Sequence, residues 1–455
     1  MAQNGATEKE QELLVRQTVM YLYRSAKFLP SPYVAEDSSR MSLAYFCLSA
    51  LALLPSEAVS SIDPSLAGVD VMLKPEQRKG YVDWVYRLQA PGGGFMGSDS
   101  LAGTERGDEE ERSLPTPIPL DDKEAADFAR LMAFPDSDDE DPPHGEGSAL
   151  PSASTAESTY CPPNLIQSYT ALLILGILND DFTRLNRAGL LRFVARCQMD
   201  DGSFAQFPGC PEPGDPRSTY SAFAMSSILD DWTAVDVDRA LHFLETCQRP
   251  EGGFATRPFA EPQGGFTYCS IACYHLSSRL ASFPNSARHL RWLVDRQVRP
   301  PPRSADDVSD EESDDEEQSE QGEPKDMAGF QGRSGKDTDA CYSFWMTAAL
   351  RLLRPDLSLL QPELDQRWLL ECQHKMYGGI AREPGALPDV YHTYLSLAAL
   401  SLSVTPSPSS APIASASPSI SLPLRPLDPA WNVSLDIAER MRTALAALPK
   451  LELDG

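Results

Sequence analysis

The chain has 455 residues and a formal net charge of −27 at pH 7, which is long enough for one large domain or two to three ordinary ones. The charge is concentrated, because residues 99–146 carry 16 acids against 4 bases and residues 304–326 carry 12 against 1; subtracting this −23 leaves −4 for the rest. The acidity argues against a nucleic-acid partner, whose phosphates would be repelled.

The cysteines and the apolar segments indicate a cellular compartment. The nine cysteines show no disulfide framework spacing, and Cys197, Cys247 and Cys372 lie within amphipathic patterns, where a reduced cysteine packs as a small hydrophobe. This usage predicts a reducing, cytoplasmic environment. The chain opens without a charged-then-apolar leader and has no uninterrupted apolar run of 18 residues, so we expect neither a signal peptide nor a transmembrane segment.

A repeated pattern organises most of the chain. Residues 11–23 and 41–54 have apolar positions at helical spacing and predict two helices. Further copies follow with a period near 50 residues: an apolar helix ending in Gln, a Gly-rich turn, and a second apolar helix. Gly supplies the positive φ that such turns need. The first helix of each copy is expected at 81–89, 191–198, 241–248, 290–297 and 367–373.

This pattern predicts an all-α fold, an α/α barrel of about six helical hairpins with alternating inner and outer helices. An open solenoid also satisfies the repeat, but closure is favoured because the repeats at both ends look alike and neither end offers a polar cap. We expect one domain over residues 1–455. Disordered inserts are expected at 96–156, 299–328 and 403–429, which are rich in Asp, Glu, Ser, Pro or Ala.

Three potential metal ligands begin two apolar helical runs. Asp339 and Cys341 follow the basic residues Arg333 and Lys336, and His392 begins a later run. Asp, Cys and His together form an open zinc site whose fourth position is left for a substrate. Asp339 and Cys341 would point to opposite sides of a regular helix, so we expect them at an irregular helix start. Considered alone, Cys341 would be interpreted as a packed core cysteine, and His392 as a core or surface histidine.

The hairpins with Gln and Gly-Gly-Phe, the run 332–345, and Tyr391-His392-Thr393 together resemble the β subunits of protein prenyltransferases. The resemblance covers about residues 10–100 and 155–403. It implies a barrel of about twelve helices, one catalytic zinc ion, and an obligate α subunit built of helical pairs. It also agrees with the chemistry, because a free cysteine is only roughly 3% thiolate at pH 7, whereas zinc coordination would ionise a substrate thiol.

The resemblance assigns further roles. It places Arg217 near the C-terminal carboxylate of a peptide substrate. Gln263 departs from the family, which usually has His at this position; its amide can donate a hydrogen bond but carries no charge. The alternatives are a solvated basic turn for the cations and ordinary core packing for the aromatic residues. The implied diphosphate-binding residues are Arg333, Lys336, Tyr342, Arg382 and Gln263, and the implied lipid-lining residues are Ser42, Phe46, Tyr220, Phe266, Cys269 and Trp345.

Two positions distinguish members of the family. Ten residues before the histidine, farnesyl and Rab-type enzymes carry an acid that recruits magnesium, and the type I geranylgeranyl enzyme carries a lysine. Here the residue is Arg382, so no magnesium requirement is expected. Ser42 stands where the farnesyl enzyme has a Trp that closes its pocket.

These two residues favour the catalytic β subunit of a type I protein geranylgeranyltransferase. Its substrates would be geranylgeranyl diphosphate and the C-terminal Cys-a-a-Leu (CaaX) tails of small GTPases, such as Rho-type proteins. A protein farnesyltransferase β subunit is the alternative.

Two other classes of protein share parts of the pattern. A terpene cyclase would share the hairpins, and Asp136-Ser-Asp-Asp139 resembles its acidic initiator, but this sequence lies in an acidic low-complexity tract. A barrel that only binds partners would leave the Asp/Cys/His set and the basic cluster without a role.

Overall fold

The computed structural model describes residues 2–28, 31–54, 73–98, 162–299, 327–354, 357–404 and 424–451. The inserts expected at 96–156 and 299–328 lie almost wholly outside the described residues. The same is true of most of the third, 403–429, but its last residues, 424–429, are described. There the chain forms a short strand, and Leu427 is buried, so these six residues belong to the packed domain.

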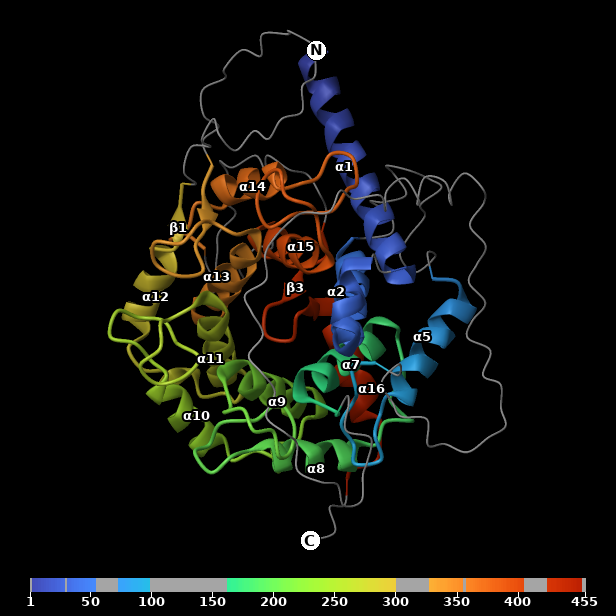
Figure 1. Cartoon of the computed structure of the whole chain (residues 1–455), viewed down its shortest axis with the longest axis vertical. Helices are drawn as coiled ribbons and strands as arrows, with labels where there is room; N and C mark the ends of the chain where they lie inside the picture. The colour runs from blue at the N-terminus through green and yellow to red at the C-terminus, as the bar shows by residue number, and fades with distance from the viewer. Residues whose placement is uncertain are drawn as a thin grey trace, which may run out of the picture.

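In the part of the chain that the structure describes, six helices form an inner ring and six others lie around it (Figure 1). Each inner helix contacts its neighbours on both sides, and α15 contacts α2, so the ring closes. The closed α/α barrel is therefore confirmed, and the open solenoid was the wrong alternative. The inner helices are α2 (Arg40–Leu53), α7 (Leu165–Ile177), α9 (Pro216–Leu229), α11 (Gly264–Leu276), α13 (Ala340–Leu353) and α15 (Val390–Val404). The outer helices are α1 (Ala2–Lys27), α5 (Pro75–Arg87), α8 (Arg187–Cys197), α10 (Val237–Thr246), α12 (Ser286–Val294) and α14 (Pro362–Glu371).

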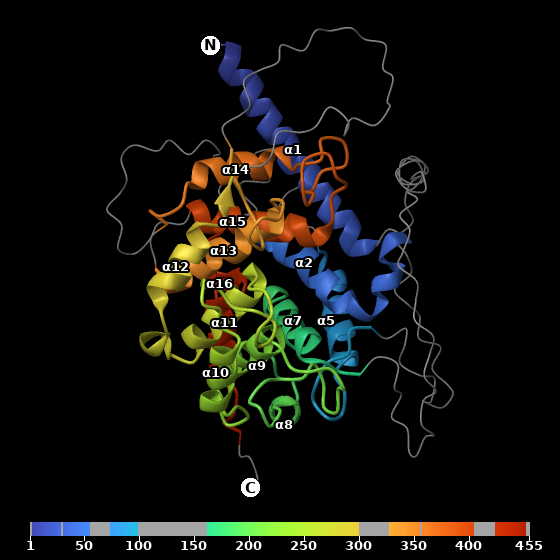
Figure 2. The same cartoon turned by 60° about the vertical axis from the view of Figure 1, so that its left-hand side comes forward.

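Short elements complete the described part. The 3-10 helices are η1 (Ser31–Ser39) and η3 (Leu280–Ser282). Strand β1 (Gln297–Val298) pairs antiparallel with β2 (Gly329–Phe330), and β3 (Leu427–Asp428) pairs antiparallel with β4 (Val433–Ser434). The last helix, α16 (Leu435–Ala446), packs against α7 and α9 (Figure 2). Among these described elements, no helix combines the length and the apolar character needed to cross a membrane.

Burial explains which helices are inner and which are outer. The inner helix α7 is apolar on every side and buries all but one of its residues, as expected for a helix enclosed by protein. The outer helix α10 has one apolar stripe and buries four residues, leaving its charged face to solvent.

The repeated Gln joins one hairpin to the next. Gln198, at the end of α8, donates from Nε2 to the carbonyl oxygen of Asp236 (2.9 Å) and accepts from its backbone N–H (2.9 Å). Asp236 is the N-cap of the next outer helix, α10. Gln297 makes the same pair of bonds with Gln361, each of 2.9 Å, before α14. The Gln that recurs in each copy of the repeat therefore connects one copy to the next.

A buried acid on α14 makes stability depend on pH. Asp365 is 3% exposed and accepts a 2.6 Å hydrogen bond from Ser343 Oγ. Burial raises the pKa of Asp365 from 3.8 to about 7, although the bond from Ser343 opposes this. The folded state thus holds the proton more tightly than the unfolded state does, and stability falls as the pH rises from the unfolded pKa to about 7.

We expect Asp365→Asn to raise the free energy of unfolding by about 4 kcal/mol at pH 8 and by about 1.5 kcal/mol at pH 5, because the neutral amide removes the cost of burying a charge. Denaturant unfolding at both pH values measures this. Glu363→Gln, which changes an exposed acid on the same helix, is the control. An equal gain for Asp365→Asn at both pH values would contradict the explanation.

Candidate metal centre

Three equivalent loops meet at the N-terminal ends of α11, α13 and α15. They span residues 255–262, 331–338 and 381–388, and the first and last residues of each form an antiparallel bridge. The loops are also linked through the helix starts, because Gly264 N–H donates to the Gly332 oxygen (2.9 Å) and Ala340 N–H donates to the Arg382 oxygen (2.8 Å). The side chains that follow the loops and accept hydrogen bonds from the first turns are Gln263, Asp339 and Asp389.

The structure brings the three predicted metal ligands together. Asp339 is the N-cap of α13, and its Oδ1 accepts from the Cys341 N–H at 2.9 Å. His392 Nε2 lies 3.2 Å from the same oxygen. One carboxylate oxygen, Cys341 Sγ and one ring nitrogen all lie within 4.8 Å of one another. Asp339 has an extended backbone (φ −142°), so the two α13 ligands do lie at an irregular helix start.

The donor set fits a metal ion. A tetrahedral zinc ion with bonds of about 2.0–2.3 Å holds its ligand atoms about 3.3–3.8 Å apart, so only a small contraction is needed here. Burial raises the pKa of the Cys341 thiol well above its ordinary value, and the thiol is 5% exposed. Without a cation this sulfur keeps its proton, and a cation would stabilise the thiolate.

Asp389, which the sequence analysis did not single out, lies against the predicted ligand His392. Its Oδ2 lies 2.5 Å from His392 Nδ1, and its Oδ1 accepts from the His392 N–H at 2.8 Å. A carboxylate on one ring nitrogen orients the other toward a metal. Burial lowers the pKa of His392, but the hydrogen bonds to Asp339 and Asp389 outweigh burial and raise it to about 9. The feature of the sequence that could have indicated Asp389 is its position, since Asp389 directly follows its loop as Asp339 directly follows the preceding loop.

We expect Asp389→Asn to weaken zinc affinity by about 10–100-fold, because the ring loses the carboxylate that orients it. Competition with a chromophoric chelator measures the affinity. The matched control is Asp337→Asn, which changes an exposed acid in the neighbouring loop and should leave affinity unchanged. Equal affinities of Asp389→Asn and the unsubstituted protein would show that Asp389 has no such role.

The predicted diphosphate-binding residues lie on the same loops or at the helix starts that follow them. Gln263 Nε2 donates to the Tyr342 hydroxyl at 2.8 Å, so the amide at the unusual position holds this phenol. Burial raises the pKa of Tyr342 to about 12, and the nearby Arg333 opposes this rise. Arg333 Nη1 lies 3.3 Å from Glu261 Oε2. Lys336 is exposed on the 331–338 loop.

Arg382 combines a fixed backbone with an exposed side chain. Its carbonyl oxygen accepts from Ala340, the residue after the ligand Asp339. Its guanidinium lies 2.6 Å from Glu383 Oε1, and the side chain is 59% exposed. The backbone of Arg382 is thus fixed next to the metal ligands, while the charged end of its side chain remains exposed.

An aromatic cluster adjoins the metal ligands. Trp345 Nε1 donates to the Tyr391 hydroxyl at 3.3 Å, and the Tyr391 ring centroid lies 5.4 Å from that of Phe46. Tyr391 precedes the ligand His392 in the chain. Ser42 lies in the first turn of α2, where its N–H and hydroxyl both donate to Gln167 Oε1 at 3.1 Å.

The remaining predicted residues lie on α9 and α11. The Arg217 guanidinium is 2.6 Å from Asp215 Oδ2 and 5.4 Å from the centroid of Phe266. Cys269 is 3% exposed, and burial raises the pKa of its thiol. Tyr220 is 5% exposed, and its hydroxyl is directed into the protein.

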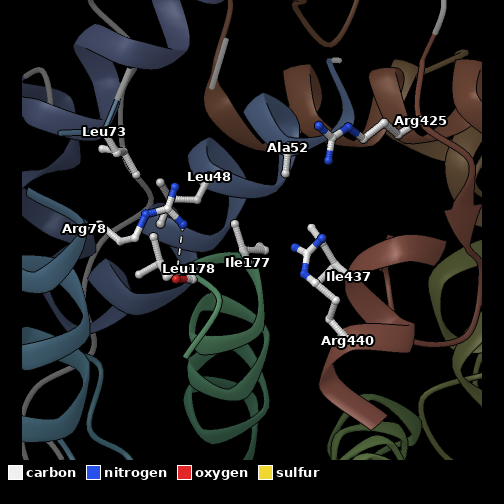
Figure 3. A pocket seen from close by; sticks show the side chains of 9 residues that line it. All are labelled: Leu48, Ala52, Leu73, Arg78, Ile177, Leu178, Arg425, Ile437 and Arg440. Carbon is white, nitrogen blue, oxygen red and sulfur yellow. Dashed lines mark hydrogen bonds between the residues drawn. The ribbon is translucent and has the colours of Figure 1, made fainter. Parts of the chain in front are cut away.

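A separate pocket in the described part lies between α2, α7 and α16 (Figure 3). It contains no metal-ligand set, and Asp436 pairs with two of its arginines at 3.2 and 3.0 Å. The metal centre, and not this pocket, is therefore the candidate functional site. The lining residues are Leu48, Ala52, Leu73, Arg78, Ile177, Leu178, Arg425, Ile437 and Arg440.

Comparisons with known proteins agree with this geometry. A family model described as the prenyltransferase alpha-alpha toroid domain matches residues 13–433. The chain is 29% identical over 397 residues to the geranylgeranyl transferase type-1 subunit beta of Arabidopsis thaliana, covering 84% of this chain and 83% of that protein. It is 32% identical over 249 residues to the protein of the same name in Dictyostelium discoideum, covering 54% of this chain and 61% of that protein.

A more distant relative and a solved structure extend the comparison. The Schizosaccharomyces pombe protein farnesyltransferase subunit beta is 24% identical over 405 residues, covering 86% of this chain and 79% of that protein. The structure of Candida albicans protein geranylgeranyltransferase-I complexed with GGPP superposes with a TM-score of 0.68 at 21% identity, covering 95% of this chain and 99% of that chain. At this identity the superposition supports the fold alone.

Proposed function

Because this chain belongs to the prenyltransferase alpha-alpha toroid family, we propose that it is the catalytic β subunit of a zinc-dependent protein geranylgeranyltransferase type I. The observation that carries the proposal is the convergence of Asp339, Cys341 and His392 within 4.8 Å. The similarity to two proteins named as type-1 β subunits supports the choice within the family.

The reaction is the transfer of a geranylgeranyl group from its diphosphate to the cysteine of a C-terminal CaaX tail ending in Leu, carried by small GTPases such as Rho-type proteins. The cofactor is one zinc ion, held by the three ligands. The partner is a prenyltransferase α subunit, in an obligate heterodimer, and the place of action is the cytoplasm.

The chain's own residues perform the other tasks of the reaction. Bound zinc would supply the positive charge that keeps a substrate thiol ionised at neutral pH. Arg333 and Lys336 bind the diphosphate and, with the Tyr342 hydroxyl that Gln263 orients, stabilise its developing charge. Arg382 provides a fixed cation where other family members recruit magnesium.

The rest of the site selects and holds the two substrates. The aromatic faces of Phe46 and Trp345 tolerate cationic character on the prenyl carbon. The small side chain of Ser42 leaves room for a fourth isoprene unit. Arg217 pairs with the carboxylate of the peptide, and the half-buried Phe266 and the buried Cys269 line the lipid.

Co-expression with the α subunit provides the test. After zinc loading, the heterodimer is offered farnesyl or geranylgeranyl diphosphate with a Cys-a-a-Leu peptide, with and without magnesium. We expect geranylgeranyl transfer that does not depend on magnesium. A preference for the farnesyl donor or a strict magnesium requirement would instead assign the chain to the farnesyl enzyme, and no transfer with any donor would favour a barrel that only binds partners.

A further inference from the structure

Five inner helices direct a tyrosine toward one short segment inside the ring. The segment, residues 429–432, connects β3 to β4, and Figure 1 shows β3 surrounded by the inner helices. The tyrosine is the fifth residue of its helix, or the sixth in α2, and α13 has Phe344 at this position. We call these residues the tyrosine ring: Tyr45, Tyr169, Tyr220, Tyr268 and Tyr394.

Consecutive carbonyl oxygens of the segment accept hydrogen bonds from three of these hydroxyls. Tyr268 donates to residue 429 at 2.8 Å, Tyr220 to residue 430 at 2.9 Å, and Tyr169 to residue 431 at 2.9 Å. Each hydroxyl is therefore already satisfied as a donor and has a lone pair left to accept with.

Asn432 supplies the complementary bonds. Its Nδ2 lies 3.0 Å from the hydroxyls of Tyr220 and Tyr268 and 3.4 Å from that of Tyr169. Its backbone oxygen accepts from Tyr45 at 2.6 Å and from Tyr394 at 2.8 Å. Asn432 is 6% exposed and has a φ of 59°. This one residue thus joins all five hydroxyls in a nearly dry environment, where satisfied polar networks fix a single arrangement.

The tyrosine ring adjoins the aromatic cluster beside the metal ligands. Phe46 stacks on Tyr394 with the ring centroids 5.9 Å apart, and Trp345 lies 5.2 Å from Tyr268. Tyr391 contacts Phe46 and Trp345 in turn. A continuous aromatic surface therefore leads from the metal centre to the rings that Asn432 holds.

The helix geometry places the tyrosine ring close to the metal ligands. Cys341 is the second residue of α13 and the ring position is the fifth, so the ring lies about 4.5 Å further along the helix axis at 1.5 Å per residue. A prenyl chain bound beside the metal would therefore meet the faces of the tyrosines rather than continue down the axis. We call this face of the tyrosine ring the floor.

We propose that Asn432 is a positioning residue which fixes this floor and thereby limits the length of the prenyl chain that is accepted. The inference rests on the proposed function, because it requires a prenyl donor. Without the amide, the hydroxyls of Tyr169, Tyr220 and Tyr268 keep their carbonyl acceptors and their contacts with one another, but they lose the one donor that all three share. The tyrosine rings can then shift and admit a longer prenyl chain.

Two substitutions distinguish the effect of the Asn432 amide from the effect of its backbone conformation. Asn432→Gly removes the amide and keeps the positive φ that glycine tolerates, whereas Asn432→Asp keeps the shape but cannot donate to the hydroxyls. The control is Asn285→Gly at an exposed asparagine with a φ of 51°. With the zinc-loaded heterodimer, we expect kcat/KM for a 25-carbon prenyl diphosphate relative to the 20-carbon donor to rise about tenfold in both Asn432 variants and not in the control.

The measurements also include zinc content and thermal unfolding, so that a loss of fold is not mistaken for a change of selectivity. If the Asn432 variants do not fold, Tyr220→Phe and Tyr268→Phe, which delete one hydroxyl each and keep the ring, are expected to show the same shift in the ratio. Unchanged donor ratios in folded, zinc-loaded variants would overturn the inference alone. If the unsubstituted heterodimer transfers no prenyl group to any peptide, the proposed function fails and the inference falls with it.

Discussion

Replacing Cys341 by alanine is expected to abolish tight zinc binding and to lower kcat/KM for prenyl transfer by about a thousandfold or more, equivalent to about 4 kcal/mol of lost charge stabilisation. Cys341 provides the sulfur of the donor set, and its loss leaves only Asp339 and His392, whose nearest atoms are 3.2 Å apart. Two ligands do not complete a zinc site. Metal analysis of the purified heterodimer and a transfer assay measure the two effects.

The control for this experiment is Cys210→Ala. Cys210 is a half-buried free cysteine in the loop before α9, outside the metal centre, so its replacement should leave both zinc content and transfer unchanged. Full zinc occupancy in purified Cys341→Ala would contradict the assignment of the sulfur as a ligand, whatever the remaining activity.

The second large effect is expected from Arg382→Asp. Reversing this charge should lower transfer by about 100–1,000-fold in the absence of magnesium, the range observed when one group that stabilises developing charge is removed. Millimolar magnesium should restore a large part of the loss, because the new carboxylate would bind the cation beside the diphosphate. A magnesium titration of the initial rate tests both statements.

An exposed arginine on an equivalent loop provides the comparison. Arg257 lies on the 255–262 loop, and Arg257→Asp reverses the same charge away from the 381–388 loop. It should produce no magnesium dependence. If Arg382→Asp and Arg257→Asp behave alike, the effect of Arg382 is one of general surface charge and not of a specific contact with the leaving group.

The sequence predicted the parts of the structure that depend on local patterns. The repeated Gln and the Gly turns indicated the hairpins, because each hairpin uses the same connection, as Gln198 and Gln297 show. A closed ring and an open solenoid use the same local contacts, so closure could be predicted only from the lack of a polar cap at either end of the repeats. The contact between α15 and α2 distinguishes them, as do the hydrogen bonds that join α1 to residues 379 and 388.

Other features depend on tertiary contacts that have no local signal. The His392 ring lies between the carboxylates of Asp389 and Asp339, an arrangement that a helix-start pattern does not specify. Tyr220 was predicted as a lipid-lining residue, and the sequence gives no indication of where its hydroxyl bonds. Two of its partners, Ala430 and Asn432, lie more than 200 residues away, directly after a tract expected to be an insert.

Ring closure has a consequence for biosynthesis. The Tyr45 and Tyr394 hydroxyls meet at 2.8 Å across 349 residues, and both bond to Asn432, which the ribosome adds after all six inner helices. Until that segment emerges, five hydroxyls lack their carbonyl partners and the apolar inner helices cannot complete their burial. Contacts of such sequence separation form slowly, and exposed apolar surface favours aggregation during the delay. The nascent toroid should therefore depend on chaperones more than an ordinary helical bundle of similar size does.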